Sequence, residues 1–184
     1  VFGEVSGGGF AEYVAAPADW MVAKPAHLGF EEASTIGVAA ETALQALRDW
    51  GRLEEGQRVL VNGASGGVGT YAVQLAKALG AAHVTAVCST HNVETAARIG
   101  ADRVVDYTRE DATATRERYD LIFDNAGVWP LRTCGRMLAD GGSYVMVTSP
   151  KSRWLHPLPR MVANPLYFML ASGHAPGFRV AARS

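Results

Sequence analysis

The stretch Asn62-Gly63-Ala64-Ser65-Gly66-Gly67-Val68-Gly69 decides the fold of this chain. It follows the β-branched run Arg58–Asn62 and leads into a segment, 68–79, whose apolar residues recur at helical spacing. Glycines between a strand and a helix leave the amides of the helix N-terminus open to an anion such as a pyrophosphate. The stretch therefore predicts a strand, a phosphate-binding turn and a helix. A tight crossover without a ligand is the alternative interpretation.

The segments around this turn continue the alternation of strands and helices. We expect strands at 58–62, 83–87, 103–106, 120–124 and 143–147 and helices at 31–50, 68–79, 93–99 and 131–138, with a further polar helix that Thr108 opens and in which Asp111 stands three residues on. Short strands that alternate with helices are typical of a parallel α/β sheet. The predicted fold class is a doubly wound Rossmann sheet.

Three domains or parts of domains are expected. Residues 1–28 contain two predicted strands, at 10–14 and 20–24, which are too few for an independent domain and indicate the end of a β-rich one. Residues 29–150 are the predicted nucleotide-binding domain, and 151–184 are an irregular extension that we expect to be truncated. Because the chain starts at Val1 inside this pattern, we expect it to be a fragment.

Composition excludes several classes of function. The chain has 184 residues, of which 48% are hydrophobic and 19% charged, and its formal net charge of −1 provides no broad basic field for nucleic acid. Cys88 and Cys134 are too far apart for a Cys-x-x-Cys metal site, and no metal ligands are assigned. The longest apolar run, 161–171, is too short for a membrane span. A cytoplasmic protein is expected.

The choice between NADH and NADPH depends on the end of the second strand. An acidic residue there would bind the ribose 2′-hydroxyl of NADH. This chain has Cys88-Ser89-Thr90-His91-Asn92, and no carboxylate occurs before Glu94. Hydroxyls and an imidazole suit a 2′-phosphate, so NADP(H) is the predicted cofactor. His91 is equally well explained as an exposed loop residue.

The glycine pattern also fits the short-chain dehydrogenases. Those enzymes need a tyrosine followed four residues later by a lysine on one helix face. None of the six tyrosines here has such a lysine. Some 57 residues also precede the glycine strand, and these have no place in that class.

A second resemblance fits better. The chain resembles the zinc-independent quinone oxidoreductase and enoyl reductase branch of the medium-chain dehydrogenase/reductase superfamily over residues 9 to about 159. The segments that carry the resemblance are Phe10-Ala11-Glu12-Tyr13-Val14, Thr42-Ala43-Leu44-Gln45-Ala46-Leu47, the glycine turn, Gly100-Ala101-Asp102 with Val105-Asp106-Tyr107, and Tyr119-Asp120-Leu121-Ile122-Phe123-Asp124-Asn125. The resemblance implies a GroES-like catalytic domain, of which 1–28 are the C-terminal remnant, before the Rossmann domain.

The same resemblance implies roles for individual residues. By this likeness Ala64, Ser65, Gly66, Gly67 and Val68 hold the pyrophosphate; Ser89, Thr90 and Tyr107 surround the 2′-phosphate; Asn125, Val147 and Thr148 line the path to the nicotinamide; and Val38 and Thr42 lie beside it. Simple packing explains Val38 and Thr42 as well, a strand-end aromatic explains Tyr107, and a turn cap explains Asn125.

The implied activity is hydride transfer from NADPH to a quinone or an α,β-unsaturated carbonyl compound (an enone), without zinc. No catalytic residue is assigned, because the proton donor is expected in the catalytic domain. Partners would be a small-molecule substrate and a second copy of the chain in a homodimer. Two alternatives stay open: a non-catalytic NADP(H)-binding module or sensor, and a zinc-dependent alcohol dehydrogenase whose ligands lie outside this chain.

Overall fold

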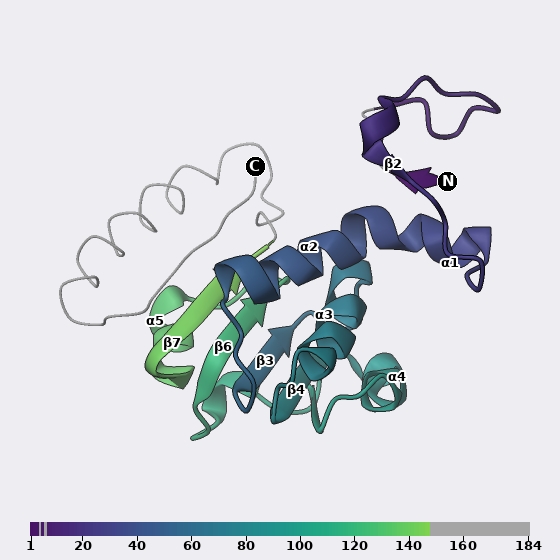
Figure 1. The fold of residues 1–184 in the computed structure, drawn as a ribbon. Coiled ribbons are helices and arrows are strands. Elements are labelled where there is room, and N and C mark those ends of the chain that lie inside the picture. Colours follow the sequence, from purple (N-terminus) through teal and green to yellow (C-terminus); the bar gives the residue numbers. More distant parts are fainter. Residues whose placement is uncertain (4, 6, 148–184) are drawn as a thin grey trace, which may run out of the picture.

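The computed structural model describes residues 1–3, 5 and 7–147, and its centre is a five-stranded parallel sheet (Figure 1). The strands of this sheet are β3 (Arg58–Asn62), β4 (His83–Cys88), β5 (Arg103–Asp106), β6 (Tyr119–Asp124) and β7 (Leu138–Met146). Their spatial order is β5-β4-β3-β6-β7, so the direction of progression reverses at β3. This order is that of a dinucleotide-binding α/β sheet, and the predicted Rossmann fold class is confirmed.

Helices cover both faces of the sheet. A continuous helical segment crosses the molecule above the sheet in Figure 1 and comprises α1 (Phe30–Thr35), η2 (Ile36–Ala40), α2 (Glu41–Leu44) and η3 (Gln45–Trp50), of which η2 and η3 are π-helical. The other α-helices are α3 (Gly67–Ala78), α4 (Val93–Arg98) and α5 (Leu131–Met137). Short 3-10 turns lie at η1 (Ala18–Trp20), η4 (Thr90–Asn92) and η5 (Ala112–Ala114).

The side chains of β3, the central strand, alternate between the hydrophobic cores on the two faces of the sheet, because successive residues of a strand point to opposite faces. Val59 and Val61 pack on the face covered by α2, η3, α3 and α4. Leu60 packs on the opposite face, with Met137 of α5 and Tyr144 of β7. Because both faces are covered, β3 is buried along nearly its whole length, which explains its uninterrupted apolar sequence.

The helix predicted at 31–50 is confirmed over Phe30–Trp50. Its apolar spacing of four and three residues places Ala43 and Leu47 at zero exposure against the sheet. The prediction did not include the two π-helical segments. A π turn carries one more residue than an α turn and is common at functional sites.

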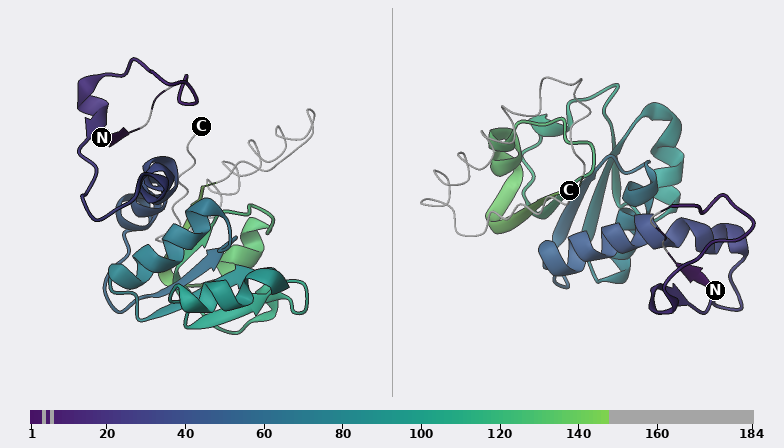
Figure 2. Two further views of the ribbon diagram at one scale, coloured as in Figure 1. Left: turned by 90° about the vertical axis from the view of Figure 1, so that its right-hand side faces the viewer. Right: turned by 90° about the horizontal axis from the view of Figure 1, so that it is seen from above.

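The N-terminal part departs from the sequence prediction. β1 (Phe2–Gly3) pairs antiparallel with β2 (Met21–Val22), at the far end of the long helical segment from the parallel sheet (Figure 2). The strand predicted at 20–24 is therefore present in part, whereas the strand predicted at 10–14 is wrong, since this segment is turn and coil. Phe10 and Tyr13 are fully or almost fully exposed. A strand needs a hydrogen-bonding neighbour, and no strand in the described part of the chain lies beside this segment.

The polar helix predicted to begin at Thr108 is also wrong. The amide and the hydroxyl of Thr108 both donate to the Asp106 carboxylate, at 2.9 Å and 2.7 Å. A side chain that bonds the backbone two residues ahead competes with helix capping. The helix is reduced to η5, whose cap is Asp111, which accepts the Thr113 amide at 2.8 Å.

The remaining predicted strands and helices between 58 and 147 are present, within a few residues at most of their expected ends, except that β7 begins at Leu138 instead of 143. No helix in the described ranges is both long and apolar enough to cross a membrane.

Candidate functional site

The glycine turn joins the end of β3 to the start of α3, as the sequence predicts. Asn62 is buried as the last residue of β3, and Ala64 is fully buried below the turn. The amides of Gly63 and Ala64 donate to the carbonyl oxygen of Val87 in β4, at 3.2 Å and 3.0 Å. Ser65, Gly66 and Gly67, in contrast, are exposed. The turn is thus anchored on the sheet and open on its outer side.

Two glycines are required by the geometry of this turn. Gly63 has a φ of +80°, a conformation that side chains rarely adopt. A Cβ on Gly69 would lie 2.1 Å from the Gly63 carbonyl oxygen and 2.8 Å from Cα of Ala64. The first turn of α3 therefore packs directly on the loop backbone, which is the close helix-to-strand approach of dinucleotide-binding turns.

The N-terminus of α3 has amides available for a ligand. Gly66 is the N-cap and has an extended backbone, but it contributes no side-chain cap. Within the described residues, no hydrogen bond satisfies the amides of Ser65, Gly67 or Val68. Open amides at the positive end of a twelve-residue helix suit an anion. The residues present therefore fit a pyrophosphate.

Asn125 meets this turn from the other side of the reversal point. Its amide donates to the Asn62 carbonyl oxygen at 3.0 Å, and its Nδ2 lies 3.6 Å from the position of a Cβ on Gly66. The residue follows β6, the neighbour of β3 in the sheet. In open α/β sheets ligands bind where the strand order reverses, so Asn125 lies at the expected place.

A buried carboxylate fixes this junction. Asp124 has zero exposure, and its Oδ1 accepts Nδ2 of Asn62 at 2.8 Å and the amides of Ala126 and Gly127 at 3.1 Å and 2.8 Å. Its Oδ2 accepts the Tyr144 hydroxyl at 2.8 Å. Burial, followed by the charge of Asp124, raises the pKa of Tyr144 well above its usual value, so this phenol stays a donor.

A second carboxylate organises the ends of β4 and β5. Oδ2 of Asp106 accepts the Thr90 hydroxyl at 2.6 Å and lies 3.5 Å from Nε of Arg109. Its Oδ1 accepts the amide and the hydroxyl of Thr108. The Thr90 hydroxyl in particular lowers the pKa of Asp106, which is therefore ionised at neutral pH. Three hydrogen bonds and one ion pair therefore converge on this carboxylate.

The other residues predicted near a 2′-phosphate lie around this group. Ser89 accepts Nδ2 of Asn92 through its hydroxyl at 3.0 Å, and Tyr107, whose amide donates to Cys88, leaves 61% of its surface exposed. His91 is exposed in η4. The structure therefore brings Ser89, Thr90 and Tyr107 to neighbouring strand ends.

The residues predicted at the nicotinamide end are described in part. The amide of Val147 donates to the Asp124 carbonyl oxygen at 3.1 Å, which places Val147 beside the end of β6. Thr148 lies outside the described residues. Thr42 is half-buried in α2, which packs against α3, and Val38 is 60% exposed in η2. Ala39, between them, approaches the start of α3: its Cβ lies 3.9 Å from the position of a Cβ on Gly67.

Sequence reasoning missed three residues of this edge: Asp106, Arg109 and Asp124. Asp124 was recognisable as an acid at the end of an apolar strand. Arg109 was passed over because the groups for a 2′-phosphate were sought at 88–92, after the second strand, whereas the arginine comes from the loop after the next strand. No group of three His, Cys, Asp or Glu side chains within the described residues is placed to hold a metal ion.

Comparisons with known proteins agree with this geometry. The family model described as zinc-binding dehydrogenase matches residues 67–169. The chloroplast envelope quinone oxidoreductase homolog of Arabidopsis thaliana is 36% identical over 174 residues, which are 89% of this chain and 53% of the relative. A trans-enoyl reductase of Aspergillus terreus is 40% identical over 124 residues, 66% of this chain and 35% of the relative.

Solved structures give the same result. The quinone oxidoreductase of Thermus thermophilus, described together with its complex with NADPH, matches with a TM-score of 0.76 and 28% identity, over 99% of this chain and 56% of that one. The chain thus spans about a third to a half of the length of the curated relatives.

Proposed function

We propose a function for this chain from its family, since the chain belongs to the medium-chain dehydrogenase/reductase superfamily. It would be the cofactor-binding part of an NADPH-dependent oxidoreductase that reduces a quinone or an α,β-unsaturated carbonyl compound. The observation that carries the proposal is the open N-terminus of α3 at the reversal point of the sheet. Ala64, Ser65, Gly66, Gly67 and Val68 would hold the pyrophosphate there.

The preference for NADPH rests on the group around Asp106. This carboxylate already accepts from Thr90 and Thr108 and faces Arg109, so a ribose 2′-hydroxyl would compete with the chain's own donors for it. The Arg109 side chain is 74% exposed and places a cation at the same strand end. A guanidinium with nearby hydroxyls suits a 2′-phosphate, with Ser89, Thr90 and Tyr107 as its further neighbours.

The nicotinamide end would lie at β6 and β7, on the other side of the turn. Bound NADPH supplies the hydride. Asn125 and Val147, held at the ends of adjacent strands, would position the ring, with Thr148 after them and Thr42 on the α2 side. The chain's own contribution to catalysis is therefore binding and orientation.

The substrate class is supported by the names of the relatives, which include a quinone oxidoreductase homolog and a trans-enoyl reductase. Independence from zinc, action as a homodimer and a cytoplasmic location are further parts of the proposal. A relative named for the chloroplast envelope makes the location a question for fractionation of the source cells.

A titration of the 184-residue chain with NADPH and NADH, followed by the fluorescence of the reduced nicotinamide, tests the proposal. We expect binding of both, with tighter binding of NADPH. If neither cofactor binds, the proposal is wrong. The longer protein of which this chain would be a part, called the extended protein below, is then assayed for oxidation of NADPH by a benzoquinone and by an enone, with and without a zinc chelator.

Two other outcomes of these assays have a clear meaning. Tight binding of NADPH by the extended protein without consumption by any quinone or enone would support the non-catalytic module. Activity toward an alcohol that the chelator abolishes would support the zinc-dependent alcohol dehydrogenase.

A further inference from the structure

A cavity with several charged side chains on its wall lies away from the carboxyl edge of the sheet. It has a volume of about 560 Å³ and is lined by Arg116, Arg118 and Arg136, with Asp111 and Thr113 on its wall. Arg116 and Arg118 directly precede β6, and Arg136 lies in the last turn of α5, directly before β7. Residues that precede parallel strands lie at the amino edge of the sheet. Its lining contains none of the residues assigned to the cofactor, although Asp111 also lines a neighbouring pocket that includes Tyr107 and Arg109.

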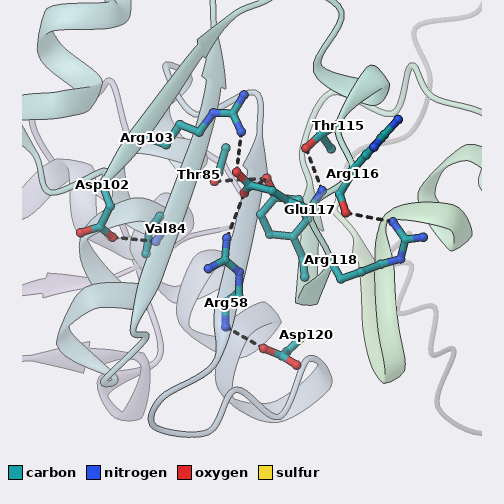
Figure 3. Close-up of polar contacts among 11 residues, drawn as sticks. Arg58, Val84, Thr85, Asp102, Arg103, Thr115, Arg116, Glu117, Arg118 and Asp120 are labelled. Atoms are coloured by element: carbon teal, nitrogen blue, oxygen red, sulfur yellow. Dashed lines mark hydrogen bonds and ion pairs between the residues drawn. The ribbon is translucent and has the colours of Figure 1, made fainter.

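The charged side chains of the segment before β6, residues 116–118, extend in two different directions. Glu117 accepts Nη2 of Arg58 at 2.9 Å and Nη1 of Arg103 at 2.7 Å, and the Tyr119 hydroxyl donates to it at 3.1 Å. Figure 3 shows Glu117 directed toward these two arginines, while the side chains of Arg116 and Arg118 extend away from it. Glu117 is the acid nearest in sequence to both, and it is already occupied by other cations.

The arginines of the cavity have little to neutralise them. No ion pair within the described residues involves Arg116, Arg118 or Arg136. Asp111 is ionised, since hydrogen bonds from Thr113 lower its pKa, and it leaves the three guanidinium groups with an excess of two positive charges. Residues 148–184 contain no Asp or Glu.

Simple explanations account for only part of this cluster. Arg136 interacts favourably with the negative end of the α5 dipole. Arg116 and Arg118 lie in coil, where this effect is absent. Their side chains make one hydrogen bond within the described residues, in which Nη1 of Arg118 donates to the Arg116 carbonyl oxygen at 3.4 Å. The three arginines are exposed, so solvent screens much of the repulsion between them, and a bound anion would reduce what remains.

We propose that this cavity binds a small oxyanion with at least two negative charges, of the pyrophosphate or phosphate-ester class. Guanidinium groups bind phosphate oxygens through paired hydrogen bonds, and the volume is in the range of small-molecule sites. Arg118 and Arg136 approach the ligand from different elements, which favours a compact anion over an extended chain.

Calorimetric titration with inorganic pyrophosphate tests the proposal, with the chain kept saturated with NADPH so that the glycine turn is occupied. We expect binding that weakens at least about tenfold in Arg118→Gln and in Arg136→Gln, because each removes a charged hydrogen bond. Arg132→Gln is the matched control, an exposed arginine of the same helix outside the cavity lining. The same titration with ADP compares the affinity of the cavity for a nucleotide with its affinity for a free oxyanion.

The proposal is overturned by absence of binding up to about 10 mM pyrophosphate, a concentration at which specific sites are filled. It is equally overturned if Arg132→Gln weakens binding as much as the cavity variants, since this result indicates only the general charge of the surface. Melting temperatures of the variants separate a folding defect from a loss of binding. Arg136→Gln that lowers only the melting temperature would assign Arg136 to the helix dipole and contradict the site.

Discussion

The Thr90 hydroxyl donates a 2.6 Å hydrogen bond to the Asp106 carboxylate and so joins the ends of two adjacent strands. This contact turns the acid inward, toward hydroxyls, while Arg109 remains exposed beside it. The acid that binds the ribose 2′-hydroxyl of NADH ends the second strand of such sheets, here β4, whereas Asp106 ends β5. The hydroxyls of Thr90 and Thr108 and the guanidinium of Arg109 thus gather at one carboxylate next to the end of β4.

Arg109→Gln tests the preference for NADPH. We expect the affinity for NADPH to fall about tenfold while that for NADH stays nearly unchanged, since only NADPH carries the phosphate that the guanidinium would contact. Parallel fluorescence titrations with the two cofactors measure the effect. Arg98→Gln, an exposed arginine of α4, is the control. Equal losses for both cofactors would count against a 2′-phosphate contact.

Gly69→Ala tests the packing of α3 on the glycine turn. The added methyl would lie 2.1 Å from a backbone oxygen, so we expect a loss of about 2 kcal/mol in the free energy of unfolding and loss of cofactor binding. Urea denaturation and titration measure the two effects. Gly135→Ala is the matched control: nothing lies within 4 Å of its added carbon, and the helix should gain up to about 1 kcal/mol. Similar behaviour of both variants would contradict this account.

Asp124→Ala removes the acceptor of three buried hydrogen bonds and one part-buried hydrogen bond. The donors of Asn62 and Tyr144 and two backbone amides would lose this acceptor, so we expect a cost of about 3 kcal/mol or more in unfolding free energy. Asp140→Ala, at an exposed position of β7, should change it by less than about 0.5 kcal/mol. A cost at Asp124 no larger than at Asp140 would show that the network does not stabilise the fold.

Cys134 predicts a pH dependence. Burial, followed by the charge of Asp124, raises the pKa of this thiol from 9.0 to about 12. Its contribution to stability is complete below pH 9 and is lost between about pH 9 and 12, because the unfolded thiol ionises there and the folded one does not. The slope is at most about 1.4 kcal/mol per pH unit. Urea midpoints from about pH 8 to 11 measure it, and Cys134→Ala should make the decline shallower; an unchanged slope would refute this.

Native thiol chemistry gives an independent check of the same burial. Cys88 and Cys134 are both buried and free, and burial raises the pKa of each. Because the thiolate is the reactive form, labelling by a disulfide reagent at about pH 8 should be slow in the folded chain and rapid in urea. Fast labelling of both thiols without denaturant would show that the two cores open readily.

The parallel sheet could be predicted because its strands are continuous apolar runs between helical patterns. Local pattern is sufficient where both faces of a strand are buried, as in β3 and β6. It fails at 10–14, where β-forming residues occur without a neighbouring strand to receive their hydrogen bonds. It fails again at Thr108, because Asp106 competes for the hydroxyl that would cap a helix.

The glycine turn of the candidate site could be predicted from the sequence, but the side chains that hold the site together could not. The spacing of the glycines is visible in the sequence, and the open amides lie where it predicts. Asp106 and Arg109 act across strands that are neighbours only in space, and Asp124 reaches Tyr144 twenty residues later. Such pairings depend on the strand order, which local periodicity does not contain.

The junction at Asp124 has a thermodynamic consequence for any ligand that spans the edge. One carboxylate holds the ends of β3 and β6, the loop after β6 and the hydroxyl of a β7 residue. These segments therefore lose their conformational freedom when the chain folds, before a ligand arrives. Association then carries a smaller entropic penalty for ordering loops, and preorganisation of this kind strengthens binding without any additional contact.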